Sequence, residues 1–152
     1  MRLFRLTREK YAHELSGIGA ARFGYRWNSA GVEMIYTAES RALALAEVLP
    51  RLTAETLPND FCMVEITVPD EVKVHTLSQK SLPADWSMFP HPESTKAFGD
   101  SFVKEGKYCL MRVPSAVVEG DFNCLINPHH GQFAKIKVDA VRRFKVDHRL
   151  VR

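Results

Sequence analysis

Glu47 is the residue that points most directly to chemistry, because it is a carboxylate inside an apolar run. Residues 42–49 are apolar on all sides of the helix that they predict, and such a helix is expected to be buried. A carboxylate on a buried helix is costly unless it is paired and hydrogen-bonded. Glu47 is therefore expected either to face a cleft and serve chemistry, or to reach water at the helix edge, or to pair with a core arginine.

Arg26 is a candidate partner for this carboxylate. It lies between Tyr25 and Trp27, and residues 28–31 are expected to follow as a loop. The guanidinium is a planar fork that binds a carboxylate or a phosphate through two contacts, and it also stacks on aromatic rings. Taken alone, the segment is equally compatible with a surface arginine beside a packed tryptophan.

Two hydroxyl side chains complete the set of candidates. Tyr36 precedes the Glu47 helix within an expected strand, where a tyrosine is ordinarily a core residue with a satisfied hydroxyl. It gains a functional interpretation only if it converges with Arg26 and Glu47. Ser115 follows Pro114, and by itself it would be interpreted as a turn serine.

Several other chemical patterns find no support in the sequence. The six histidines show no HxxxH or HxH spacing, so no metal site is predicted. Cys62, Cys109 and Cys124 form no CxxC pair and lie in apolar runs, which predicts buried, reduced thiols. No GxGxxG motif is present, so a Rossmann mode of dinucleotide binding is unsupported.

The overall composition is that of an ordinary globular protein. A length of 152 residues favours one domain over 1–152. The net charge of +3 suits a small anionic ligand or an acidic partner and is too small to indicate nucleic acid. The N-terminus lacks the apolar core of a secretory signal, and no apolar stretch approaches the roughly 20 residues that span a membrane. A cytoplasmic protein is expected.

Basic residues accumulate at the C-terminus. This group is interpreted either as a solvated face or as a docking surface for an acidic partner or a DNA-bound complex. Its members are Arg142, Arg143, Lys145, His148, Arg149 and Arg152.

The elements that must position the candidates are mostly strands. Residues 32–37 predict the strand of Tyr36, and residues 39–49 predict the helix of Glu47, which Pro50 ends. Residues 16–21 predict a flexible segment, and residues 78–98 a long irregular loop. Further strands are expected at 61–68, 72–77, 107–113 and 124–126, within 133–151, and, as a strand or short arm, at 2–14. Because strands outnumber helices without regular alternation, the sequence predicts the α+β class.

Taken together, the candidates follow a known pattern. The segments GYRWNSAG at 24–31, IYTAES at 35–40 and ALAEVL at 44–49 closely resemble the RES-domain toxin family, named for an Arg, a Glu and a Ser. Residues 98–100, 112–118 and 123–130 match the rest of that pattern in order, so the resemblance covers essentially the whole chain. The family Arg, Tyr, Glu and Ser fall on Arg26, Tyr36, Glu47 and Ser115. The chain departs from the pattern after Asp100 and at Gly131, away from these four positions.

The resemblance implies a fold similar to that of ADP-ribosyltransferases, with twisted, mostly antiparallel sheets flanked by helices. It implies a toxin that depletes NAD by cleaving the nicotinamide–ribose bond, as a glycohydrolase or phosphorylase. It also implies an Xre-type antitoxin partner whose C-terminal part blocks the active site. Contact with DNA is then indirect, through the antitoxin, and a homodimer can form within the complex.

The resemblance also suggests a role for each candidate residue, with NAD as substrate and no cofactor. Glu47 would stabilise the positive charge of an oxocarbenium-like state through the ribose hydroxyls. Arg26 would hold the pyrophosphate or the adjoining ribose, and Tyr36 would stack on nicotinamide. Ser115 would hydrogen-bond the ribose or the amide, and Asn28 would contact NAD as well.

Three other functions are alternatives to NAD depletion. The first is a protein ADP-ribosyltransferase that uses NAD. The second is a degenerate, non-catalytic module that only binds the antitoxin; retention of Arg26, Tyr36, Glu47 and Ser115 together counts against it. The third is a nuclease-like toxin, for which the sequence offers no cluster of acidic metal ligands and no catalytic His pair.

Overall fold

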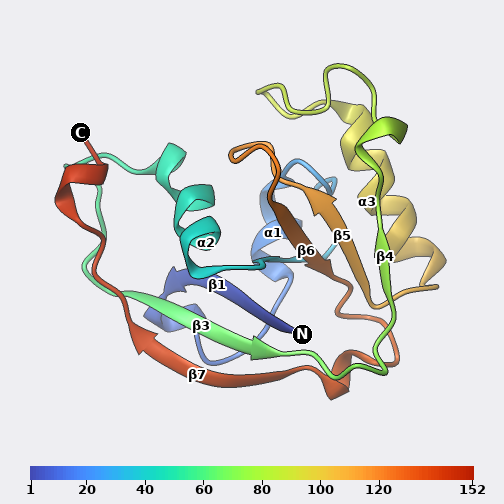
Figure 1. The fold of residues 1–152 in the computed structure, drawn as a ribbon, viewed down its shortest axis with the longest axis horizontal. Coiled ribbons are helices and arrows are strands. Elements are labelled where there is room, and N and C mark those ends of the chain that lie inside the picture. Colours follow the sequence, from blue (N-terminus) through green and yellow to red (C-terminus); the bar gives the residue numbers. More distant parts are fainter.

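A seven-stranded sheet forms the centre of the computed structural model, which describes residues 1–152 (Figure 1). The spatial order of the strands is β4-β5-β6-β2-β1-β3-β7. The strands are β1 (Arg2–Arg8), β2 (Ile35–Ala38), β3 (Phe61–Thr67), β4 (Val74–Thr76), β5 (Leu110–Pro114), β6 (Phe122–Ile126) and β7 (Lys137–Arg143). β4 and β5 are parallel, and the other neighbouring pairs are antiparallel. With the helices α1 (Ile18–Phe23), α2 (Arg41–Val48) and α3 (Glu93–Glu105), the predicted α+β class is confirmed.

The sheet narrows at the junction of β1 and β2, which pair only through Phe4 and Ala38. Figure 1 shows β1, β3 and β7 running across the lower left, while β4, β5 and β6 run more steeply on the right. Apolar residues of α2 pack against β1 and β3, and Phe102 of α3 packs against β5 and β6. Glu47 on α2 and Ser115 after β5 are therefore supplied by the two different parts of the sheet.

Two helices lie where the sequence indicated none. The expected flexible segment at 16–21 contains the start of α1, and the expected loop at 78–98 is irregular only as far as Pro92. α3 begins at Glu93 and ends at Glu105, and Gly106 caps it in the left-handed conformation with φ +62°. The sequence did not indicate this helix because Gly99 lies in its middle, and glycine is a poor helix former. None of the helices is long and apolar enough to span a membrane.

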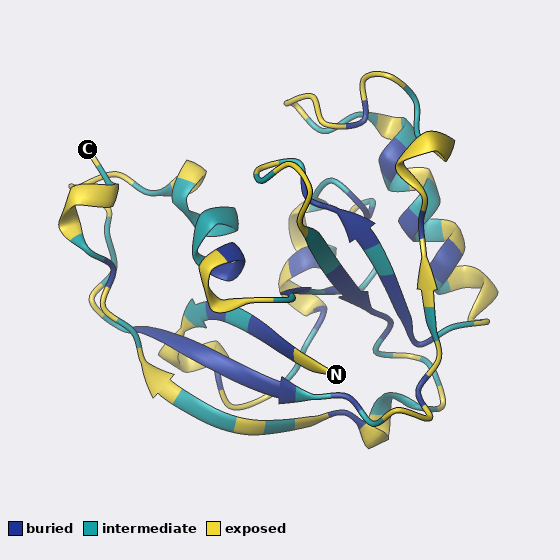
Figure 2. Cartoon of the chain, viewed as in Figure 1, coloured by how far each residue is buried: buried dark blue, intermediate teal, exposed yellow.

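The strand predictions are confirmed in place, with shifted ends. β2 begins at Ile35 rather than at residue 32, because residues 28–33 belong to the loop after α1. The three cysteines are buried and unpaired, as predicted. In Figure 2 the central strands are mostly buried, whereas β7, at one edge of the sheet, is largely exposed. Most of the basic C-terminal side chains are likewise exposed, as a solvated face would be.

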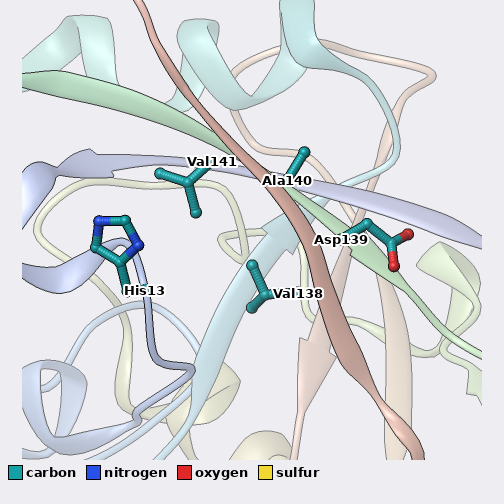
Figure 3. Close-up of a pocket in the computed structure, with 5 residues that line it drawn as sticks. All are labelled: His13, Val138, Asp139, Ala140 and Val141. Carbon is teal, nitrogen blue, oxygen red and sulfur yellow. The ribbon is translucent and has the colours of Figure 1, made fainter.

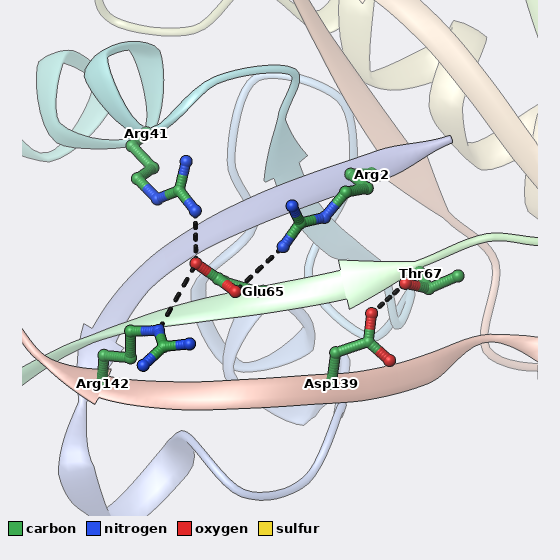
Figure 4. A network of polar contacts seen from close by, with 6 residues as sticks. All are labelled: Arg2, Arg41, Glu65, Thr67, Asp139 and Arg142. Atoms are coloured by element: carbon green, nitrogen blue, oxygen red, sulfur yellow. Dashed lines mark hydrogen bonds and ion pairs between the residues drawn. The ribbon is translucent and has the colours of Figure 1, made fainter.

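One buried carboxylate ties β1, β3 and β7 to the helix α2 that covers this part of the sheet. Glu65 on β3 is 4% exposed and is surrounded by three arginines (Figure 4). Arg2 lies 2.9 Å from its Oε2, Arg41 of α2 donates to its Oε1, and Arg142 of β7 lies 3.7 Å away. The hydrogen bond from Arg41 is the main reason why the pKa of Glu65 is lowered. The network therefore connects α2, which carries Glu47, to the sheet beneath it.

Because the pKa of Glu65 is lower in the folded than in the unfolded chain, its charge stabilises the fold above the ordinary glutamate range. That contribution is lost as the pH falls through the folded pKa. We expect Glu65→Gln to lower the free energy of unfolding at pH 7, and this deficit relative to the wild type to shrink toward pH 3. Urea unfolding at several pH values measures it, with the exposed Glu55→Gln as control. A deficit that does not change with pH would contradict this account.

Candidate active site

Glu47 and Ser115, which are 68 residues apart in the chain, meet in the fold. Ser115 Oγ donates a hydrogen bond of 2.7 Å to Glu47 Oε1. Ser115 Oγ also accepts hydrogen bonds from the backbone N–H groups of Val117 and Val118, at 3.1 and 3.0 Å. The two N–H groups occupy the acceptor positions of the Ser115 hydroxyl, and its single proton is donated to Glu47. Ser115, only 4% exposed, therefore fixes the orientation of the carboxylate.

Glu47 is half-buried, and the helix around it is not fully covered. Leu43 and Ala44 of α2 are buried, whereas Arg41 and Ala42 are exposed. The inference from an all-apolar run to a buried helix is thus wrong, because much of the run is alanine, which is small enough to face water at little cost. The carboxylate lies at the edge of the helix, where one oxygen is held by Ser115 and the other accepts no hydrogen bond within the chain.

Arg26 does not form an ion pair with Glu47. Its Nη1 donates to the backbone carbonyls of Trp86 and Met88, at 2.8 Å each. These carbonyls belong to the irregular segment before α3, so the arginine fastens this segment to the loop after α1. Burial lowers the pKa of Arg26, and the negative charge of Glu47 partly offsets that effect. Arg26 and Glu47 are thus close enough to act on one another electrostatically.

The Tyr36 hydroxyl organises the loop that carries Arg26. It donates to Asn28 Oδ1 at 2.6 Å and accepts from the Trp27 backbone N–H at 3.1 Å. Its ring meets the Tyr25 ring edge-on, with centroids 5.7 Å apart. Burial raises the pKa of Tyr36 well above its usual value, which keeps the hydroxyl protonated and able to donate.

Asn28 is in a position that differs from the expected contact with NAD. It is 0% exposed, and its Nδ2 donates to the carbonyls of Ala20, Ser29 and Val32 at 2.9 to 3.2 Å. Its Oδ1 accepts from Tyr36 and from the Tyr25 N–H. With both polar atoms used inside the fold, Asn28 holds the loop in shape and positions Tyr36 and Arg26, and its contact with NAD stays a prediction.

Loss of the Tyr36 hydroxyl should therefore destabilise this loop and with it the fold. We expect Tyr36→Phe to lower the free energy of unfolding by about 1–2 kcal/mol, because the Trp27 N–H loses its partner in a covered site. Urea unfolding measures this, with Tyr11→Phe, an exposed tyrosine, as the matched control. Equal stability of wild type and Tyr36→Phe would show that the hydroxyl does not hold the loop.

α3 clamps the same loop from the other side. Gly99 packs so closely that a Cβ placed there would lie 1.5 Å from the carbonyl oxygen of Trp27. Asp100 accepts from the Ser29 N–H at 2.9 Å and from its hydroxyl at 2.5 Å. In the sequence, Gly99 and Asp100 stand out only as neighbouring members of the family pattern at residues 98–100. Both act through the loop that carries Arg26.

A hollow in the surface lies away from these residues. It has a volume of about 410 Å³ and is lined by His13 and by Val138, Asp139, Ala140 and Val141 of β7 (Figure 3). None of the four family positions lines it. No group of three or more His, Cys, Asp or Glu side chains is arranged to hold a metal ion.

Comparison with known proteins decides the family. The family model described as RES domain matches residues 2–147. The chain belongs to the RES-domain family. It is 38% identical over 143 residues to a protein of Sphingobium sp. named Prs ADP-ribosylating toxin, covering 93% of this chain and 89% of that protein. It is 34% identical over 155 residues to Toxin Res of Photorhabdus laumondii, covering 100% and 98% of the two chains.

A solved structure also resembles this RES domain. In the crystal structure of the MbcT–MbcA toxin–antitoxin complex of M. tuberculosis, one chain superposes with a TM-score of 0.76 at 22% identity. The match covers 95% of this chain and 84% of that chain. At this level of identity the likeness shows the fold alone. In the RES domain described here, Ser115 touches Glu47, while Arg26 and Tyr36 are joined to each other through the backbone of Trp27.

Proposed function

We propose that this RES domain is the toxin of a toxin–antitoxin pair and that it cleaves the nicotinamide–ribose bond of NAD. The observation that carries the proposal is the Ser115–Glu47 hydrogen bond, which holds a half-buried carboxylate in place within electrostatic reach of Arg26. Relatives named as toxins, at 34–38% identity over nearly their whole length, support the same role.

The chemistry needs few groups, because NAD already contains a good leaving group. The bond between C1′ of the ribose and the pyridinium nitrogen breaks, both electrons go to that nitrogen, and neutral nicotinamide departs. Positive charge then develops on the ribose as an oxocarbenium-like state, which a nearby carboxylate stabilises. Glu47 supplies that carboxylate, and Ser115 keeps it from rotating.

The acceptor completes the reaction. With water, the products are ADP-ribose, nicotinamide and one proton; with orthophosphate, they are ADP-ribose 1″-phosphate and nicotinamide. Either reaction drains NAD without a second protein. Arg26 holds the anionic part of the dinucleotide in this proposal, and its Nε and Nη2 donors make no hydrogen bonds within the chain.

A second candidate is transfer of ADP-ribose to a protein nucleophile. The specific observation in its favour is the name of the Sphingobium relative, Prs ADP-ribosylating toxin, at 38% identity. Bond cleavage at C1′ is the same in this reaction, and only the acceptor differs. A purified protein that releases nicotinamide only when a protein acceptor is added would favour this candidate over hydrolysis or phosphorolysis.

The partner in this proposal is an Xre-type antitoxin that covers the region of Arg26 and Glu47. The net charge of +3 and the exposed basic side chains near the C-terminus favour a partner of acidic or mixed charge, because long-range attraction speeds association. An uncontrolled NAD-cleaving enzyme would be harmful to its own cell, so an inhibitor is required.

The proposal makes a direct prediction for cells. Expression of the chain alone should arrest growth and lower cellular NAD, and Glu47→Gln should relieve both effects. Co-expression of the antitoxin encoded beside it should restore growth. Growth rate and extracted NAD are the two measurements. Normal growth with intact NAD during expression of the wild-type chain would favour the degenerate, non-catalytic module instead.

A further inference from the structure

Three cationic side chains from different elements converge beside Arg26's loop. They are Arg26 itself, Arg51 in the turn after α2, and Lys96 near the start of α3. The Arg51 guanidinium carbon lies 5.7 Å from the centre of the Tyr25 ring, next to Arg26 in the chain. Arg26 donates a hydrogen bond to the carbonyl of Met88. The ring of Phe89, the residue after Met88, meets the His91 ring edge-on, with centroids 5.3 Å apart.

His91 lies within electrostatic reach of all three side chains. Burial lowers its pKa most, and Arg26, Lys96 and Arg51 each lower it further through their positive charge. Arg51 also lies one helical turn beyond Glu47 in sequence, so it is close to the end of α2 that carries the carboxylate. The cations therefore form a positive region adjoining Glu47, which we call the cationic rim: Arg26, Arg51 and Lys96.

The charges of the cationic rim are only partly compensated. Arg26 and Arg51 form no ion pair, although the charge of Glu47 acts on Arg26 at longer range. Lys96 lies 3.5 Å from Glu93, but that carboxylate is 88% exposed, whereas the lysine side chain is only 22% exposed. Exposed pairs of this kind contribute at most about 1 kcal/mol. Cations gathered without matching carboxylates repel one another, and an anion bound among them removes that cost.

Two orphaned polar atoms belong to the same chain segment, between Met88 and Lys96. His91 Nδ1 and Ser94 Oγ are buried and have no hydrogen-bond partner within the chain. Buried polar atoms in proteins are nearly always hydrogen-bonded, so each unpartnered one calls for an explanation. Both atoms can donate a proton to an anionic oxygen. They are therefore suited to the same ligand as the cationic rim.

We propose that the cationic rim, with Ser94 and His91, is a subsite for a phosphate group. This inference rests on the proposed function for the source of the phosphate. One source is the pyrophosphate of the dinucleotide, which would place its cationic nicotinamide riboside end toward Glu47 and its anionic middle toward Arg51 and Lys96. The other source is free orthophosphate, held as the acceptor in phosphorolysis.

Binding measurements on the full chain test the subsite without relying on turnover. The Glu47→Gln chain, which can be produced safely, is titrated in a calorimeter with ADP-ribose, with orthophosphate and with adenosine. Arg51→Gln and Lys96→Gln are then added singly. We expect each to weaken the binding of a phosphate-bearing probe about tenfold, the worth of one charge-assisted hydrogen bond, and to leave adenosine unchanged.

The controls separate charge at this place from charge in general. Lys104→Gln removes a lysine from the same helix, α3, two turns farther along, and should not change binding. Arg51→Lys should keep most of the affinity. Weaker binding of ADP-ribose identifies the dinucleotide as the source, and weaker binding of orthophosphate alone identifies the acceptor. Unchanged affinity for both anions in the two variants would overturn the inference.

The proposed function and this inference can fail separately. Cleavage of NAD by the wild type, together with unaltered anion binding in the Arg51 and Lys96 variants, would refute the subsite alone. A chain that binds ADP-ribose through Arg51 but never releases nicotinamide would refute the proposed function and leave the subsite in place.

Discussion

Glu47→Gln should lower the rate of NAD cleavage by about a hundredfold to a thousandfold, the usual cost of removing one group that stabilises transition-state charge. The amide has nearly the same shape as the carboxylate and can still accept from Ser115, so the fold should be unchanged. What is lost is the negative charge beside the developing oxocarbenium ion. Nicotinamide release by the purified variant, measured at saturating NAD, gives the effect on kcat.

Two further variants sharpen this result. Glu105→Gln, at the exposed end of α3, removes an equal charge and should keep wild-type turnover. Ser115→Ala should fall between Glu47→Gln and the wild type, because the carboxylate remains but is no longer oriented. Turnover by Glu47→Gln within about threefold of the wild type would remove Glu47 from the mechanism, since one general electrostatic group is normally worth far more.

Gly99→Ala should have the largest effect on stability. A Cβ at this position would lie 1.5 Å from the Trp27 carbonyl oxygen, and the obstacle is backbone, which cannot swing aside. Either α3 or the loop from Gly24 to Gly31 must move. Overpacking typically costs 1–3 kcal/mol, and we expect a loss at or above the upper end, about 3 kcal/mol.

The matched control for Gly99 is another glycine within a helix. A Cβ on Gly19 of α1 meets no atom within 4 Å, so Gly19→Ala should be neutral or stabilise by about 0.5–1 kcal/mol, the ordinary helix preference for alanine. Urea unfolding of both variants measures the difference. Equal stabilities of Gly99→Ala and Gly19→Ala would show that α3 does not clamp the loop as described.

The strands were largely predictable because short apolar runs in the sequence indicate strands that are buried in the core. Residues 61–68 gave β3 to within one residue, and the three cysteines are buried as their settings indicated. α3 was not predictable in the same way. Gly99 is unfavourable in a helix taken alone, and only the close approach to Trp27 makes it the required residue. A tertiary contact thus overrides the local preference.

The candidate site likewise has one part that the sequence predicts and another part that depends on tertiary contacts. The family pattern selected Arg26, Tyr36, Glu47 and Ser115, and in the fold Ser115 and Glu47 are in contact. No local pattern could predict that hydrogen bond, because it joins residues 68 positions apart. Asn28 shows the limit of transfer from a pattern: a residue beside the site in sequence is in fact buried, and its hydrogen bonds hold the loop together. Nor could the cationic rim be found, since its members are scattered over three elements.

The central claim is that this chain breaks the nicotinamide–ribose bond of NAD at Glu47. The most direct measurement is to incubate the purified wild-type chain and Glu47→Gln with NAD, with and without orthophosphate, and to identify the products by mass spectrometry. We predict free nicotinamide from the wild type, with ADP-ribose in the absence of phosphate or ADP-ribose 1″-phosphate in its presence, and about a hundredfold to a thousandfold slower formation of these products by Glu47→Gln. Intact NAD after incubation with the folded wild-type chain, with and without added protein acceptors, would contradict the account.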